Sequence, residues 1–146
     1  MLTALLASGA GVASLGGSVS SVESDRAHMK ATTTRTSPSA LYTVHEMQTP
    51  EGTTVREFAS PAGIVFAVAW KGPFLPDLRA ALGTYFDTYQ VAPREHRHGH
   101  AHRDLEQPGL VVHSGGHPRA FVGNAYVPGL VPAGVSIDQL LAQSDP

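Results

Sequence analysis

The sequence predicts an α+β fold: a small antiparallel sheet, or β-meander, of about five strands, with one main helix packed on a face and a short C-terminal helix. Residues 41–49 and 53–60 alternate apolar and polar side chains, which is typical of strands with one buried face. Residues 63–70 are apolar throughout, as in a central strand buried on both faces. The segment 76–90 carries its apolar residues at helical spacing.

Two similar turn sequences connect the three predicted strands. Residues 49–52 are Thr-Pro-Glu-Gly, and residues 60–63 are Ser-Pro-Ala-Gly. Proline suits the second position of such a turn because its φ is fixed, and glycine accepts a left-handed backbone. We therefore expect an antiparallel meander, with Glu46 on one face of its first strand and His45 and Met47 on the other.

The predicted helix begins near Pro76 and Asp77, since proline is tolerated in a first turn and an acidic side chain complements the helix dipole. Its apolar stripe consists of Leu78, Leu82, Tyr85, Phe86 and Tyr89. Gly83 weakens the helix but allows a close approach to the sheet, and Pro93 ends the helix.

A hairpin is predicted in the C-terminal part of the chain. Residues 109–113 and 118–127 would pair around Ser-Gly-Gly-His at 114–117, because Gly-Gly suits a tight turn. His113 and His117 would then point to opposite faces, which argues against a shared metal site. His117 is expected to hydrogen-bond the turn.

The capping box of Ser136 and Gln139 predicts the short C-terminal helix, at residues 137–143. A sheet with so few helices leaves its second face or an edge to be covered. We expect the C-terminal segment, a second copy in a homo-oligomer, or an unknown envelope or secreted partner to cover it.

The sequence predicts that the chain consists of two N-terminal segments and one folded domain. Residues 1–13 are small and apolar and end in the small-x-small pattern of a signal-peptidase site, so we expect a truncated signal peptide and a periplasmic or secreted protein. The alternative is a flexible leader. Residues 14–39 are rich in Ser and Thr and are predicted to be a disordered linker. Residues 40–146 are predicted to form a single α+β domain with a His-rich loop at 94–108.

The composition excludes several classes of function. A net charge of −2 argues against a nucleic-acid partner, and no cysteine is present for disulfides or thiolate chemistry. The N-terminal apolar run is shorter than the roughly 20 residues of a transmembrane helix, so no transmembrane span is expected.

Four histidines at alternate positions stand out in the predicted loop: His96, His98, His100 and His102. In an extended segment they would share one face, where two or three imidazoles could bind Zn, Cu or Ni. The alternative is a solvated low-complexity loop, because Arg97 and Arg103 among the histidines would oppose a cation.

The remaining candidate catalytic side chains are predicted to have structural roles. Ser114, His117 and Asp104 can be arranged as a triad, but no strand-to-helix elbow surrounds the serine, and no catalytic residue is assigned. Glu46 and Glu57 would face each other across the first hairpin, as solubilising surface groups. Trp70 is expected in the core or, alternatively, beside a groove.

Many of these residues resemble the pattern of a known bacterial family. They are Gly52-Thr53, Val55-Arg56-Glu57-Phe58, Ser60-Pro61-Ala62-Gly63, Phe66-Ala67-Val68-Ala69-Trp70, Gly72-Pro73, Leu110-Val111-Val112, Ser114-Gly115-Gly116-His117 and Arg119-Ala120-Phe121. The pattern resembles domain of unknown function 2844, a family of uncharacterised exported proteins of Burkholderia-like proteobacteria. The resemblance spans about residues 52–141, implies a small exported protein, and supplies no activity. The His-rich segment is outside it.

The sequence therefore favours a non-enzymatic binding or envelope-associated module. One alternative is a metal-binding or pH-responsive protein that acts through the His-rich loop. A cryptic hydrolase is the third. No cofactor is predicted beyond the metal ions named above.

Overall fold

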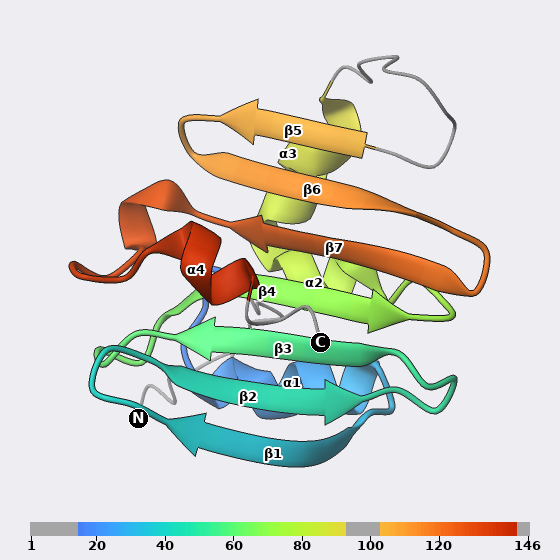
Figure 1. Cartoon of the computed structure of the whole chain (residues 1–146), viewed down its shortest axis with the longest axis horizontal. Helices are drawn as coiled ribbons and strands as arrows, with labels where there is room; N and C mark the ends of the chain where they lie inside the picture. The colour runs from blue at the N-terminus through green and yellow to red at the C-terminus, as the bar shows by residue number, and fades with distance from the viewer. Residues whose placement is uncertain (1–14, 93–102, 143–146) are drawn as a thin grey trace, which may run out of the picture.

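A computed structural model describes residues 15–92 and 103–142. Its centre is a seven-stranded antiparallel sheet with the strand order β1-β2-β3-β4-β7-β6-β5 (Figure 1). The strands are β1 (Thr32–Pro38), β2 (Thr43–Gln48), β3 (Thr54–Ala59), β4 (Val65–Gly72), β5 (Arg103–Gln107), β6 (Leu110–His117) and β7 (Ala120–Tyr126). The α+β class and the antiparallel sheet are confirmed, but the sheet is larger than the five strands expected from the sequence.

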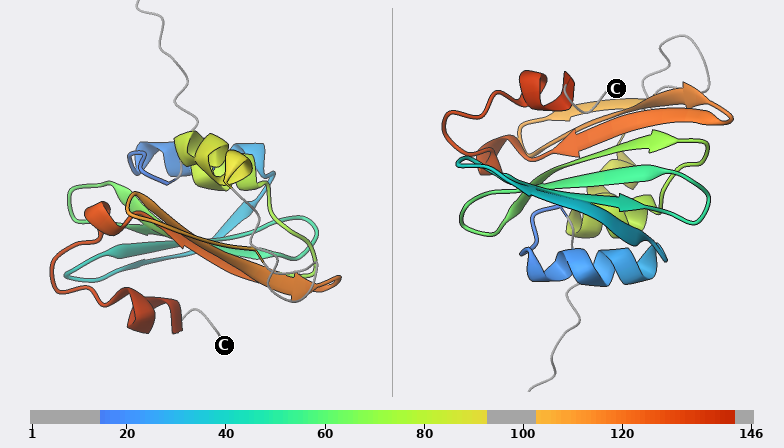
Figure 2. Two further views of the ribbon diagram at one scale, coloured as in Figure 1. Left: turned by 90° about the horizontal axis from the view of Figure 1, so that it is seen from above. Right: turned by 60° about the horizontal axis from the view of Figure 1, so that its bottom comes forward.

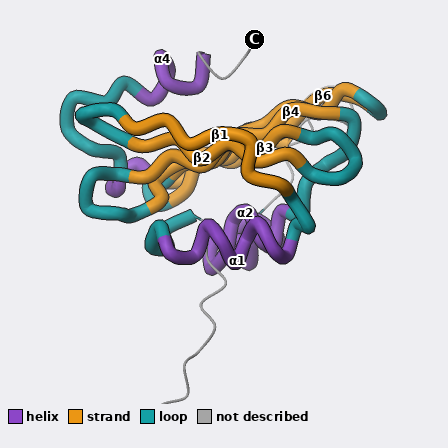
Figure 3. The backbone as a smooth tube through the Cα atoms, turned by 90° about the horizontal axis from the view of Figure 1, so that it is seen from below, coloured by secondary structure: helices purple, strands orange, loops and turns teal. Residues whose placement is uncertain are grey.

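Helices lie on both faces of the sheet. One face carries α1 (Ser20–His28), α2 (Leu78–Leu82), the 3₁₀ turn η1 (Gly83–Tyr85) and α3 (Phe86–Val91), whereas α4 (Ile137–Ala142) lies on the other face (Figure 2). Figure 3 shows α1 and α2 below the sheet and α4 above it. Within the described residues, no helix is long and apolar enough to cross a membrane.

The meander of β2, β3 and β4 is confirmed in detail. Gly52 N–H donates to Thr49 O at 3.0 Å, and Gly63 N–H donates to Ser60 O at 2.8 Å, so each Pro-Gly segment closes a turn. The two glycines have φ of 93° and 81°, in the left-handed region. In β4, every residue from 65 to 70 is buried, as an unbroken apolar strand requires.

The predicted helix at 76–90 is wrong as a single element. Asp77 caps α2 by accepting a hydrogen bond from Ala80 N at 3.1 Å, but α2 ends at Leu82. Gly83, with φ 53° and ψ −127°, departs from helical geometry, and the chain continues as η1 and α3. The apolar stripe still faces the sheet, because Leu82 and Tyr89 are buried in the core.

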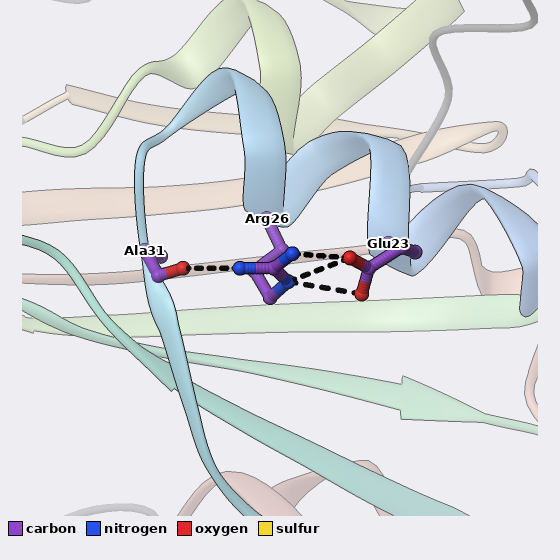
Figure 4. Close-up of polar contacts among 3 residues, drawn as sticks. All are labelled: Glu23, Arg26 and Ala31. Atoms are coloured by element: carbon purple, nitrogen blue, oxygen red, sulfur yellow. Dashed lines mark hydrogen bonds and ion pairs between the residues drawn. The ribbon is translucent and has the colours of Figure 1, made fainter.

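The predicted linker at 14–39 is also wrong, since α1 and β1 both lie within it. Arg26 joins the two elements: its guanidinium donates to the Glu23 carboxylate and, at 3.0 Å, to Ala31 O (Figure 4). The hydrogen bond between the two side chains lowers the pKa of Glu23 and raises the pKa of Arg26. Leu15, ahead of α1, is fully buried, so the domain includes residues well before 40.

The C-terminal hairpin exists, but its turn lies further along the chain than predicted. β6 runs through the Gly-Gly pair, and its last residue, His117, pairs with Ala120 of β7. Pro118 and Arg119 therefore form the turn, and Arg119 has a φ of 73°. The predicted hydrogen bond of His117 is present at this turn, where its Nδ1 lies 3.3 Å from Pro118 O.

The hydrophobic core has two parts, one on each face of the sheet. The larger cluster, under the helices, contains Trp70, Val68, Met47, Leu82 and Leu105. The smaller one, on the face that carries α4, contains Phe58, Phe66, Ala67, Ala69 and Leu140. The C-terminal segment was one of the three candidates expected to cover the second face. Its helix α4 does lie on this face and covers part of it.

Candidate functional site

A row of side chains crosses the α4 face of the sheet from edge to edge. Each residue is paired directly with the next on the adjacent strand, which places all of them on one face. From β1 to β5 the row consists of Arg35, Glu46, Arg56, Ala69, Asn124, His113 and Asp104. Ala69 is its only apolar member, and we call this set the polar row.

The polar row begins with an ion pair. Arg56 Nε donates to Glu46 Oε2 at 2.7 Å, and both side chains are only about a quarter exposed, at 26% and 25%. Partial burial strengthens such a pair relative to one on an open surface. The contact holds the Arg56 guanidinium in place over the sheet.

Three members of the polar row, Arg56, Ala69 and Asn124, also line a pocket of about 250 Å³ beside α4. Its lining residues are Thr54, Arg56, Ala69, Trp70, Lys71, Val122, Gly123, Asn124, Leu141 and Ala142. Two of them, Arg56 and Lys71, are cationic and none is acidic, although the whole chain has a net charge of −2. One of these cations, Arg56, is the partner of Glu46 in the ion pair described above.

Asn124 adds a hydrogen-bonding group to this pocket. Its Oδ1 atom is buried and has no hydrogen-bond partner among the residues that the structure describes. A buried polar oxygen without a partner costs about 1–3 kcal/mol of stability. A ligand that donates a hydrogen bond to this oxygen would recover that cost.

A second hollow of about 200 Å³ adjoins the first. Arg56 lines both hollows, and Glu46 lines the second. The helix α4 contributes to both as well, through Leu140 to the second and Leu141 to the first. The Arg56–Glu46 ion pair thus lies on the boundary between two hollows that run along α4.

The structure gives His113, Ser114 and Glu46 other neighbours than those considered from the sequence. His113 Nδ1 lies 3.2 Å from Asp104 Oδ1 on the polar row, in an exposed pair. Ser114 lies next to His113 in β6 and so faces the opposite side, which excludes the triad considered from the sequence. Glu46 pairs with Arg56 rather than facing Glu57, because Glu57 is on the helix face.

The helix face holds a polar pair of its own, a fully buried glutamate and a half-buried histidine. Glu57 is fully buried, and His45 is its direct partner across β2 and β3. Within the described part of the chain, the buried Nε2 atom of His45 has no hydrogen-bond partner, and desolvation lowers the pKa of this imidazole. His45 is therefore held neutral in the folded protein near pH 7.

The predicted metal ligands His96, His98, His100 and His102 lie outside the described residues. In the part of the chain that the structure describes, His, Asp and Glu side chains form no group of three that could hold a metal ion. Trp70 is 2% exposed and belongs to the core, and it is also among the residues that line the pocket, so both expectations for it describe part of the structure. The other residues of the pocket were missed from the sequence, because the pocket depends on the pairing of β4 with β7.

Comparisons with known proteins identify a family. The model of a family described as "Protein of unknown function (DUF2844)" matches residues 11–140. No curated protein and no solved structure matches the chain. The match confirms the resemblance found in the sequence and extends it to the N-terminal residues that carry α1 and β1.

Proposed function

The chain belongs to the DUF2844 family, and we propose that it is an exported, non-enzymatic binding module. It holds a small ligand in the pocket beside α4. The observation that carries this proposal is the unpartnered, buried Asn124 Oδ1 among the lining residues of a pocket with two cationic side chains.

The size of the pocket supports a small ligand. Sites for drug-sized ligands and cofactors enclose about 300–1,000 Å³, and this pocket encloses about 250 Å³. Apolar walls from Val122, Leu141 and Ala142 lie beside the polar groups of Arg56 and Asn124. Such a mixture gives affinity through burial and orientation through a few polar contacts.

The chemistry of the lining residues favours binding over catalysis. Among the described lining residues, no His, Cys, Asp or Glu is present to act as a general base or nucleophile. The side chains of Thr54 and Asn124 add neutral hydrogen-bonding groups. Together, these side chains are typical of a binding site.

Export rests on the sequence of residues 1–13 and on the exported character that the resemblance implies. N-terminal sequencing of the protein isolated from the periplasmic fraction of its source bacterium tests it. We expect the mature chain to begin at Ser14. Recovery of a chain that retains residues 1–13 in the cytosolic fraction would refute export.

Binding is tested by a fragment screen on paired variants. Ala69 is the floor of the pocket, between Arg56 and Asn124, so Ala69→Leu would fill the pocket. Ala27→Leu is the matched control, because Ala27 is exposed on α1 across the sheet. In ligand-observed NMR, we expect fragments that bind the wild type and the Ala27→Leu variant but not the Ala69→Leu variant. If no fragment shows this pattern, the pocket is not a binding site.

A further inference from the structure

We propose that residues 143–146 of the chain itself, Gln-Ser-Asp-Pro, dock in the pocket beside α4, so that a ligand binds only by displacing them. This inference rests on the proposed binding function of the same pocket and adds how access to it is regulated. It follows from the environment of Asn124, from the path of the chain after α4 and from the chemistry of these four residues, which we call segment 143–146.

The side chain of Asn124 indicates that the described residues leave the pocket incomplete. Its Oδ1 atom is buried, and no described residue donates a hydrogen bond to it. In folded proteins, the large majority of buried polar side-chain atoms do have a hydrogen-bond partner. A donor that belongs to this chain therefore lies outside the described residues, in 1–14, 93–102 or 143–146.

The position of α4 selects the last of these three segments. Leu141 and Ala142, the final two residues of α4, themselves line the pocket, so the chain continues into segment 143–146 from the wall of the pocket. The other two segments are attached on the opposite face of the sheet. Leu15 belongs to the core cluster under the helices, and Arg103 hydrogen-bonds a carbonyl group of α3.

The length of segment 143–146 is sufficient to fill the pocket. Four extended residues reach at most about 14 Å. A segment that starts on the wall therefore reaches across a space of about 250 Å³. Because it is tethered there, its effective concentration in the pocket is in the millimolar range. A contact with a millimolar dissociation constant is thus enough to keep the pocket occupied for a large part of the time.

The chemistry of the segment supplies the missing donor. Gln143, Ser144 and Asp145 each carry a backbone N–H group, and the first two add a side-chain amide and a hydroxyl that also donate hydrogen bonds. Any of these groups can donate to Asn124 Oδ1. A single hydrogen bond of this kind satisfies the buried oxygen without a ligand.

A double-mutant cycle on the full chain tests the docking. One change ends the chain at Ala142, and the other is Asn124→Leu, which keeps a side chain of similar size and removes its acceptor. We expect the loss of segment 143–146 to shift the folding equilibrium towards the unfolded state about tenfold in the wild type. In Asn124→Leu the shift should be less than about twofold, because no acceptor is left unsatisfied.

The matched control for this cycle is Ala27→Leu, an exposed site of α1 on the opposite face. Shortening the chain should destabilise this variant as much as the wild type. Urea unfolding followed by tryptophan fluorescence measures all of these equilibria.

The capped tetrapeptide acetyl-Gln-Ser-Asp-Pro-amide tests the same contact in trans. In ¹⁵N spectra, we expect the peptide at millimolar concentration to shift the Asn124 side-chain amide of the chain that ends at Ala142. The shift should be severalfold smaller in the full chain, whose own segment competes for the pocket. Equal shifts in the two chains would contradict docking.

Displacement by a ligand is measured with fragments that bind the wild type but not Ala69→Leu. We expect such fragments to bind the chain that ends at Ala142 about tenfold more tightly than the full chain, since a site that is open for a tenth of the time loses that factor in affinity.

The outcomes separate this inference from the proposed binding function. Equal destabilisation by the shortening in the wild type and in Asn124→Leu would overturn the inference. Fragments that depend on Ala69 but bind both chain lengths equally would also overturn it, and the pocket would remain a binding site. Coupling in the cycle without any fragment that depends on Ala69 would support the docking of segment 143–146 and refute ligand binding.

Discussion

Glu46 and Arg56 face each other directly across β2 and β3, and their side chains meet at 2.7 Å on the boundary between the two hollows of the α4 face. The register of the meander alone places them together. Because the Pro-Gly turns set that register, the sequence of two short turns determines the position of the arginine that we assign to ligand binding.

The ion pair makes a measurable contribution to stability. A double-mutant cycle of Glu46→Ala and Arg56→Ala should give a coupling energy of about 1 kcal/mol, because the pair is partly buried and retains a hydrogen bond. Urea unfolding followed by tryptophan fluorescence measures it. A coupling energy indistinguishable from zero at low salt would show that the two side chains do not interact in solution.

Gly123 is required by the close approach of Trp70. A Cβ atom at position 123 would lie 2.3 Å from Trp70 Cζ2 and 2.7 Å from His113 O. We expect Gly123→Ala to lower the free energy of unfolding by about 2–3 kcal/mol, as in other overpacked cores. Gly129→Ala is the control, since a Cβ atom at position 129 would have open space around it for 4 Å. Equal stability of the two variants in urea would contradict this packing.

Acid should destabilise the protein through His45. Burial holds the pKa of His45 below its ordinary value of 6.5, so the unfolded chain takes up this proton first as the pH falls. The contribution is complete above pH 6.5 and is lost as the pH drops from there towards the folded pKa. We expect the free energy of unfolding to fall less between pH 7.5 and pH 5 in His45→Gln than in the wild type. An equal fall in the free energy of unfolding of the two proteins would contradict a neutral, half-buried His45.

A chain that starts at residue 40 should not fold cooperatively. It lacks β1 and α1, and with them the buried side chains of Leu15, Val22 and Met29. Each such side chain contributes about 1.5–3 kcal/mol, and a domain of this size has only about 5–15 kcal/mol of stability in total. Circular dichroism during thermal unfolding compares it with a chain that starts at residue 15. A sharp transition in the shorter chain would mean that the N-terminal elements are dispensable.

The sequence was sufficient for the parts of the fold that local chemistry determines. The turns at 49–52 and 60–63, the facing of His45 and Glu46, and the fully buried run of β4 all follow from residue type and period two. The sequence was insufficient for α1 and β1. Among the described side chains, Val22 within α1 and the flanking Val19 and Met29 mark its buried side, and β1 is an edge strand of Thr, Arg, Ser and Pro without an apolar face.

The candidate site could not be predicted from the sequence for a different reason. Arg56 and Asn124 are 68 positions apart (124 − 56), and they approach each other only because β7 pairs with β4. No local pattern reports such a non-consecutive pairing. The Gly-Gly pair in β6 was misleading, because glycine served here as a strand residue before the turn at Pro118 and Arg119.

Chemical-shift mapping tests the central claim most directly. The ¹⁵N-labelled chain is titrated with a fragment that binds the wild type but not the Ala69→Leu variant, and its amide spectrum is followed residue by residue. We predict saturable shifts of the Asn124 side-chain amide together with backbone amides of 54–56, 69–71 and 122–124, the segments that line the pocket. Shifts centred on α2 and α3 across the sheet, or none at millimolar ligand, would contradict a binding site beside α4.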